Sequence, residues 1–285
     1  MGFGMARKTT GGSARAGALA ALVCLAPLAH AQDAPSSVAP LAGSGASAPT
    51  AMVAPPLSAS CDVPASDLAG PIALPNFTAA LQKRETVTIL AIGSSSTAGT
   101  GSSNTAKTYP SQLEAILEKT LKGEDVIIIN RGLPGEVAQS TAERIKSEVA
   151  LKKPDLVLWQ TGTNDALARV PASDFAATVR STVQWLKDNQ TDVALVGLQY
   201  APRLARDSNY AEIRDALKRV AAEENVLYVS RYDAMRFIAQ TRANLHLMAQ
   251  DGFHLNDLGY QCMAEHVAHA LIVSLFMKKV RPAAN

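Results

Sequence analysis

The chain has 285 residues, of which 47% are hydrophobic and 18% charged, and its formal net charge is +2. This balance is typical of a globular protein with a sizeable core. A charge so close to neutrality, with no basic patch interleaved with aromatic residues, argues against nucleic acid as a partner.

The first 31 residues have the pattern of a cleaved secretory signal peptide. Arg7, Lys8 and Arg15 precede an apolar run at 18–28, and small residues flank His30 at 29–31, as in the charged, apolar and cleavage regions of such signals. The apolar run is too short to cross a bilayer, so no stable membrane span is expected. We therefore expect a periplasmic or secreted protein.

Residues 32–64 are rich in Ala, Pro, Ser and Gly, which predicts a flexible leader because such a segment buries little apolar surface. After removal of the signal peptide two cysteines remain, Cys61 and Cys262. An oxidising compartment permits a disulfide between them. Two independent thiols, with Cys262 in a helix core, are the alternative.

From residue 65 onwards predicted strands alternate with predicted helices. Short apolar runs predict strands at 87–92, 125–130, 156–160, 193–198 and 226–229. Helical spacing of apolar residues predicts helices at 109–121, from 140 to about 152, across 175–186, and at 210–224, 233–240 and 256–277. Ser140 and Glu143 are expected to form a capping box for the second of these helices.

This alternation predicts one α/β domain over residues 65–279, followed by a short tail at 280–285. Helices should cover both faces of a mainly parallel, five-stranded sheet, which gives a three-layer α/β/α sandwich.

Three of the strands run into loops of small and polar residues, at 93–97 (GSSST), 132–135 (GLPG) and 162–165 (GTND). A fourth segment, DGFH at 251–254, precedes the last helix. Because the carboxyl ends of parallel strands meet at one edge of a sheet, we expect these segments to converge. A serine, a glycine amide, an asparagine and an Asp/His pair at one edge are the parts of a serine hydrolase.

The expected roles follow from the chemistry of acyl transfer. A serine hydroxyl needs an adjacent base, for which His254 is the candidate, and Asp251 would fix the tautomer of its imidazole. The backbone N–H groups of Ser95 and Gly135 and the side-chain amide of Asn164 would bind the oxyanion. Taken singly, each residue has a plainer explanation as a helix cap, a turn or a glycine with positive φ.

The ordered blocks GSSSTAG, NRGLPG, GTND and DGFH resemble those of the SGNH hydrolases, also called GDSL-type esterases and lipases. Aligning Gly93 and Thr97 with the first block of that family places its nucleophile at Ser95, and the later blocks fall on Gly135, Asn164 and the pair Asp251 and His254. The resemblance also implies a flavodoxin-like fold.

The chain departs from the family pattern at Ser94, where the family usually has Asp, and at Ser96, where it usually has an apolar residue. An extended exit from the first strand would point Ser94 and Ser96 away from the side that Ser95 faces. Gly132, in the second block, is expected to be a glycine with positive φ.

The resemblance implies an esterase that forms an acyl-enzyme and needs no metal or other cofactor. Since only 5% of the residues are aromatic and the protein is expected to be exported, the predicted substrate is a short acyl ester, in particular an acetyl ester on a carbohydrate. The alternatives are a lysophospholipase or thioesterase-type acyl hydrolase and a catalytically inactive glycan-binding envelope protein, which the loss of the family Asp at position 94 favours.

Overall fold

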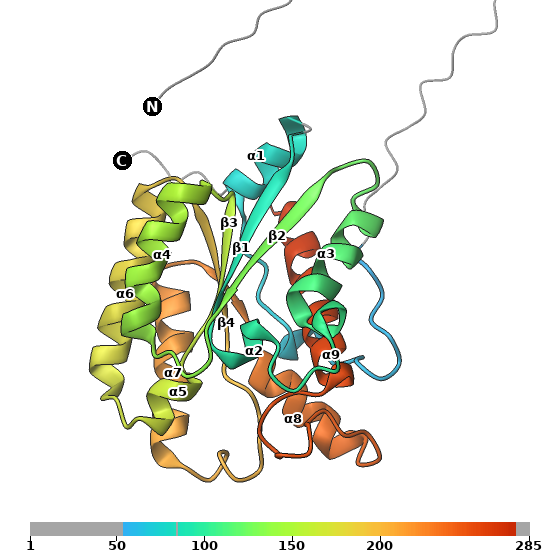
Figure 1. Ribbon diagram of the computed structural model, residues 1–285, viewed down its shortest axis with the longest axis vertical. Helices are drawn as coiled ribbons and strands as arrows, with labels where there is room; N and C mark the ends of the chain where they lie inside the picture. The colour runs from blue at the N-terminus through green and yellow to red at the C-terminus, as the bar shows by residue number, and fades with distance from the viewer. Residues whose placement is uncertain (1–53, 84, 278–285) are drawn as a thin grey trace, which may run out of the picture. The chain divides into compact units, whose positions relative to one another are not determined.

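A computed structural model describes residues 54–83 and 85–277. The predicted signal peptide, most of the predicted leader and the predicted tail at 280–285 lie outside these described residues. Five strands form one sheet in the order β2-β1-β3-β4-β5, and every neighbouring pair is parallel (Figure 1). The strands are β1 (Val87–Gly93), β2 (Val126–Gly132), β3 (Leu156–Gln160), β4 (Asp192–Val196) and β5 (Leu227–Val229). The predicted five-stranded α/β fold is confirmed.

Helices cover both faces of this sheet (Figure 1). One face is packed by α4 (Ala138–Lys152), α6 (Ala172–Asp188) and α7 (Ser208–Glu223). The other face is packed by α1 (Pro75–Lys83), α3 (Tyr109–Thr120), α8 (Arg231–Thr241) and α9 (Asp257–Leu275). Two short helices, α2 (Ser95–Ala98) and α5 (Thr163–Leu167), begin almost directly after β1 and β3. Short 3-10 turns lie at η1 (Ala65–Asp67) and η2 (Thr105–Lys107).

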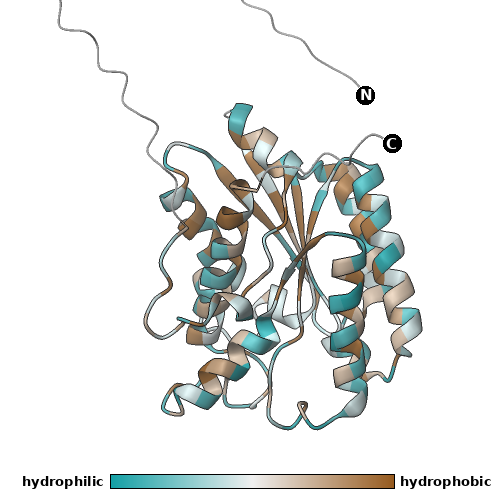
Figure 2. Cartoon of the chain, turned by 180° about the vertical axis from the view of Figure 1, so that it is seen from behind, coloured by the Kyte–Doolittle hydropathy of each residue, from teal (hydrophilic) through white to brown (hydrophobic). Residues whose placement is uncertain are grey.

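The central strand β1 has apolar side chains on both of its faces. Ile89 and Ala91 pack with α1, α3 and α9, whereas Leu90 and Ile92 pack with α4, α6 and α7. All four are fully buried. A strand that helices cover on both sides needs an unbroken apolar run, and Figure 2 shows the resulting hydrophobic strands between helices of mixed hydropathy.

Strand β2 is less buried than the central strands, although its sequence is a similar apolar run. It lies at the edge of the sheet, and its Ile127 is 50% exposed. A run of isoleucines shows no polar alternation that would mark an edge strand. The position of a strand in the sheet depends on the order in which the strands pair, which a local pattern does not reveal.

The predicted capping box of the second helix is wrong. Ser140 lies inside the first turn of α4, where its hydroxyl donates to the carbonyl of Val137 at 3.1 Å. The first N–H of this helix, that of Ala138, is instead accepted by the carboxylate of Asp165 at 2.8 Å. A loop distant in sequence therefore caps the helix, which local spacing does not reveal.

The domain begins before residue 65, the boundary that the sequence predicts. Cys61 is fully buried, Val63 is 7% exposed, and Cys61 is joined to Cys262 of α9 in a disulfide. The carbonyl of Cys61 also lies 2.6 Å from Nε2 of His266. The last part of the predicted flexible leader is thus fixed on the final helix.

No helix within the described ranges is long and apolar enough to span a membrane.

Candidate active site

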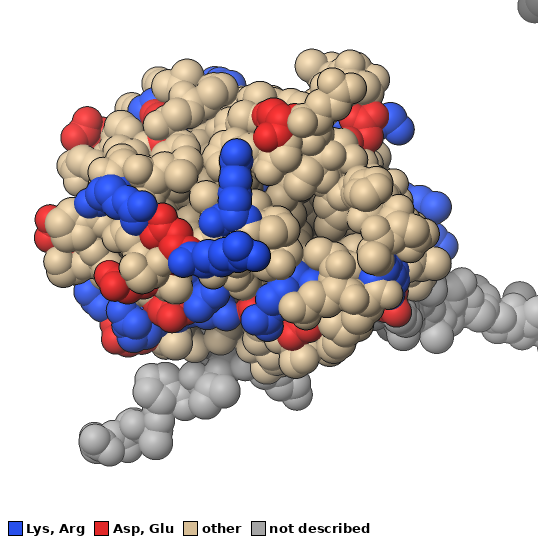
Figure 3. Space-filling view, turned by 90° about the horizontal axis from the view of Figure 1, so that it is seen from below, with Lys and Arg blue, Asp and Glu red and all other residues tan. Residues whose placement is uncertain are grey.

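The pairing of the strands brings the predicted loops together at the carboxyl edge of the sheet. Gly93 at the end of β1 is in register with Gly132 of β2 on one side and with Gln160 of β3 on the other. The N–H of Leu133 donates to the carbonyl of Gly93 at 2.8 Å. Figure 3 views the domain from this edge, where basic and acidic side chains are interspersed on one part of the face and neutral side chains cover much of the rest.

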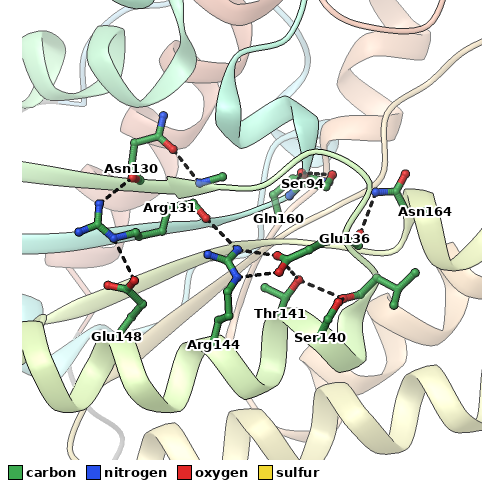
Figure 4. Close-up of polar contacts among 12 residues, drawn as sticks. Ser94, Asn130, Arg131, Glu136, Ser140, Thr141, Arg144, Glu148, Gln160 and Asn164 are labelled. Carbon is green, nitrogen blue, oxygen red and sulfur yellow. Dashed lines mark hydrogen bonds and ion pairs between the residues drawn. The ribbon is translucent and has the colours of Figure 1, made fainter.

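The three serines after β1 have different surroundings. Ser94 caps the start of α2, and its hydroxyl donates to Oε1 of Gln160 at 3.1 Å (Figure 4). Ser96 accepts a hydrogen bond from Arg231 at 3.1 Å. Ser95 is 8% exposed, and its hydroxyl forms no hydrogen bond with any residue that the structure describes.

The predicted extended exit from β1 is wrong, because a helical turn starts at Ser95. Side chains on consecutive helical residues point in different directions around the axis rather than to two opposite sides. The hydroxyls of Ser94 and Ser96 are therefore held by two different partners, Gln160 and Arg231. The hydroxyl of Ser95 therefore still has no hydrogen-bond partner among the described residues.

Asp251 and His254 form a hydrogen-bonded pair in the loop before α9. Oδ2 of Asp251 lies 2.6 Å from Nδ1 of His254, and its Oδ1 accepts the N–H groups of Phe253 and His254, both at 2.9 Å. The bond to His254, helped by the two backbone donors, lowers the pKa of Asp251 to about 2. A carboxylate thus holds the imidazole in the tautomer with hydrogen on Nδ1, which leaves Nε2 able to accept a proton.

The His254 loop packs directly on the segment that follows α2. A Cβ built at Gly101 would lie 3.1 Å from Cβ of His254, and the hydroxyl of Tyr260 donates to the carbonyl of Thr100 at 2.7 Å. Within the described chain no hydrogen bond joins Ser95 to His254. Such bonds are often long without substrate and form fully only in the complex.

Two predicted oxyanion donors lie on the loop after β2 and at the start of α5. Nδ2 of Asn164 donates to the carbonyl of Glu136 at 2.7 Å (Figure 4), and one of its two hydrogens remains available. Gly135 is exposed with φ +85°. Across the described residues the N–H groups of Ser95 and Gly135 donate to no other protein atom. These three groups can therefore donate hydrogen bonds to an oxygen of a bound ligand.

An ion pair that the sequence did not single out anchors the loop of Gly135. The carboxylate of Glu136 forms an ion pair with Arg144, whose Nε lies 2.6 Å from Oε1 of Glu136. The carboxylate also accepts a hydrogen bond from the hydroxyl of Thr141 at 3.0 Å (Figure 4). The same guanidinium donates to the carbonyl of Arg131 at 2.9 Å. Glu136 lies before α4 and eight positions from Arg144, beyond the three- or four-residue spacing of helical ion pairs, so local spacing in the sequence carries no signal for this contact.

Gly132 is required for close approach and not, as the sequence predicts, for positive φ. It is absent from the glycines with positive φ, and a Cβ built on it would lie 2.0 Å from the backbone nitrogen of Ala98. At Gly135 the situation is reversed, because φ is positive but no atom lies within 4 Å of a built Cβ. Gly132 is thus the point where β2 contacts α2.

We expect Gly132→Ala to lower the free energy of unfolding by about 1–3 kcal/mol, the usual cost of overpacking, because α2 must move away from β2. Urea denaturation followed by circular dichroism measures this loss. Gly135→Ala is the matched control: it meets open space and should cost only the backbone strain of about 1–2 kcal/mol. An undisturbed Gly132→Ala variant would contradict the close contact.

Two other histidines of the described residues contact backbone carbonyl groups. His266 is buried and bonded to the carbonyl of Cys61, and His269 lies 3.3 Å from the carbonyl of Pro55. His246 lies exposed in the loop before Asp251. In the described parts of the chain no group of three His, Cys, Asp or Glu side chains is placed to hold a metal ion.

This fold and its relatives define the chain as a carboxylic ester hydrolase. Residues 60–275 match the model of the non-GDSL lipase-like family. The chain belongs to this family, which confirms the predicted membership of the SGNH hydrolases. The name of the family agrees with the absence of the Gly-Asp-Ser sequence, since Ser94 replaces the Asp.

Individual relatives are more distant. The chain is 26% identical over 170 residues to an arylesterase of Vibrio mimicus, a match covering 59% of this chain and 80% of the relative. Among solved structures, a two-domain esterase active on acetylated mannans has a TM-score of 0.63 at 20% identity, over 77% of this chain. The chain spans 60% of that esterase. An acetyl-xylooligosaccharide esterase from Geobacillus Stearmophilus has a TM-score of 0.55 at 21% identity, over 69% of this chain and 97% of its own.

Proposed function

We propose that Ser95, His254 and Asp251 form a catalytic triad that hydrolyses short acyl esters, in particular acetyl esters on carbohydrate. The observation that carries the proposal is that the hydroxyl of Ser95 has no hydrogen-bond partner among the described residues. The segment that follows its turn packs against His254, which is hydrogen-bonded to Asp251. The neighbouring serines are bound to other side chains.

In the proposed reaction Oγ of Ser95 attacks the ester carbonyl while Nε2 of His254 takes its proton. The negative charge on the carbonyl oxygen is held by the N–H groups of Ser95 and Gly135 and by the amide of Asn164. The C–O bond then breaks, and His254 returns the proton to the departing alkoxide. Water repeats the sequence on the acyl-enzyme, which releases the acid and restores the serine.

The proposed substrate class is supported by the names of two structural relatives, an esterase active on acetylated mannans and an acetyl-xylooligosaccharide esterase. Export to the periplasm or the medium, which we also propose, would bring the enzyme to such polysaccharides. The pattern of residues 1–31 and the disulfide between Cys61 and Cys262 support export.

A second candidate is an acyl hydrolase for longer or aromatic esters. A cavity of about 420 Å³ adjoins the His254 loop, and the N–H of Ala249 in its wall donates to the carbonyl of His254 at 2.8 Å. Most of its lining is apolar, including Tyr200, Met235 and Met248. Such a wall suits a larger apolar group better than an acetyl group.

Fluorophosphonate labelling followed by peptide mass spectrometry tests the nucleophile. We expect a single modified residue, Ser95, whereas an inactive glycan-binding protein would not react. A series of p-nitrophenyl esters from acetate to octanoate, run beside acetylated xylan and mannan, tests the substrate. Highest kcat/KM on acetyl esters supports the first candidate; a steady rise with chain length supports the second.

We expect Asp251→Asn to lower kcat/KM for p-nitrophenyl acetate by about 10³–10⁴-fold, the loss seen when a triad carboxylate becomes an amide. The asparagine can keep the backbone bonds of Asp251 through its oxygen, but its amide would then donate to Nδ1 of His254. The imidazole would carry its hydrogen on Nε2 and could not take the serine proton.

Asp207→Asn is the matched control for this variant. Asp207 likewise accepts the backbone N–H groups two and three residues ahead, those of Asn209 and Tyr210, but touches no histidine. It should retain kcat/KM within about twofold of the wild type, as surface changes away from a site do. Equal losses in the two variants would show that the effect is structural.

A further inference from the structure

Arg231 is a buried arginine at the start of α8, and only 3% of it is exposed. Its Nη2 donates to Oγ of Ser96 and to Oε1 of Gln199, both at 3.1 Å. Ser96 follows the proposed nucleophile in α2, so the guanidinium lies directly against the turn that carries Ser95.

The charge of Arg231 is not neutralised. No carboxylate in the described ranges pairs with it, and its Nε and Nη1 have no hydrogen-bond partner there. The phenols of Tyr109 and Tyr260, which interact electrostatically with Arg231, have their pKa raised to about 12 by burial, so they stay neutral. An unpaired buried charge is costly, and such groups concentrate at functional sites.

The same cluster reaches the histidine loop. Nε2 of Gln199 donates to the carbonyl of Phe253 at 2.7 Å, and the next residue is His254. Oε1 of Gln199 accepts from Arg231 and lies 3.5 Å from Oγ of Ser96. Of the two side chains that accept from Arg231, Ser96 belongs to the turn of Ser95, and Gln199 binds the backbone beside His254.

We infer that Arg231 is a positioning residue, which fixes the turn of Ser95 and the loop of His254 relative to each other through Ser96 and Gln199. The inference rests on the proposed triad and adds the group that holds its two halves in place. Small errors in the placement of reacting groups cost about 10²-fold in rate, so the effect belongs in kcat and not in substrate binding.

Arg231→Met keeps the bulk of the side chain and removes its donors. We expect kcat for p-nitrophenyl acetate to fall about 100-fold with KM within about threefold of the wild type. The melting temperature should stay within a few degrees of the wild type or rise, because exchanging a buried charge for an apolar side chain is often neutral or stabilising. Arg231→Lys, which keeps the charge but carries its three N–H donors on a single nitrogen, should recover about a tenth of wild-type kcat.

Gln199→Leu removes the second link and should lower kcat in the same way. Because both residues act through one network, the double variant should be no slower than the slower single variant. Ser96→Ala tests the other link if Arg231→Met does not fold. Asp192→Ala is the control for general damage: it removes a buried carboxylate that accepts the N–H groups of Asn76 and Phe77, at the amino end of β4. It should melt earlier and keep its kcat.

Three results would overturn the inference: unchanged kcat in Arg231→Met, a loss matched by a fall in melting temperature, or additive effects of the two single variants. Fluorophosphonate labelling separates this failure from that of the proposed triad. If Arg231→Met is labelled at Ser95 as fast as the wild type, only the positioning role fails. If the wild type is not labelled at Ser95, the triad itself fails.

Discussion

Replacing Ser95 with alanine should reduce kcat for p-nitrophenyl acetate by about 10⁵–10⁶-fold, the range found when a triad nucleophile is removed. The fold should be unaffected, because the Ser95 hydroxyl makes no hydrogen bond with the described residues. The melting temperature should therefore match that of the wild type. Stopped assays with concentrated enzyme are needed to measure so low a rate, and mass spectrometry should show no fluorophosphonate adduct.

Ser94→Ala is the matched control, because it removes the same atom one residue earlier. The hydroxyl of Ser94 donates only to Gln160, so its loss should cost about 0.5–1.5 kcal/mol of stability and leave kcat within about tenfold. If Ser94→Ala is inactive while Ser95→Ala retains its rate, the nucleophile has been assigned to the wrong serine.

Removing the disulfide should have the largest effect on stability. The double variant Cys61→Ala, Cys262→Ala is expected to lose about 2–5 kcal/mol of the free energy of unfolding. The two cysteines are 201 residues apart, and a cross-link that closes a long loop restricts the unfolded chain most. Urea denaturation followed by circular dichroism measures the difference.

Reduction of the wild type provides the control for this experiment. Wild-type protein unfolded in the presence of a reductant should match the double variant, whose own midpoint should not respond to the reductant. A wild-type midpoint that is insensitive to the reductant, with two thiols that react with iodoacetamide once the protein is unfolded without reductant, would contradict the disulfide.

The sequence predicted the five strands and the four loops because an apolar run and its polar end are local features. It did not predict the edge position of β2 or the cap of α4 by Asp165, because pairing order and contacts between distant loops have no local signal. The sequence predicted that position 132 needs glycine for a positive φ, whereas glycine is required there because any Cβ would collide with the backbone of Ala98.

The part of the candidate site that could be predicted is the set of residues expected to touch substrate. Ser95, Gly135, Asn164 and the pair Asp251 and His254 are recognisable because their types and order are unusual. The residues behind them are not. Gln199 and Arg231 lie 103 and 135 positions from Ser96 in the sequence, and an isolated Gln or Arg is unremarkable until the fold places it.

The disulfide also makes the chain between Cys61 and Cys262 a covalent ring. All five strands and every residue of the proposed site, from Ser95 to His254, lie inside this ring. A protease that cuts one exposed loop between the two cysteines therefore produces two segments that the disulfide still joins as one molecule. If the protein is exported, as we propose, a single cut by an extracellular protease need not release any part of the proposed site.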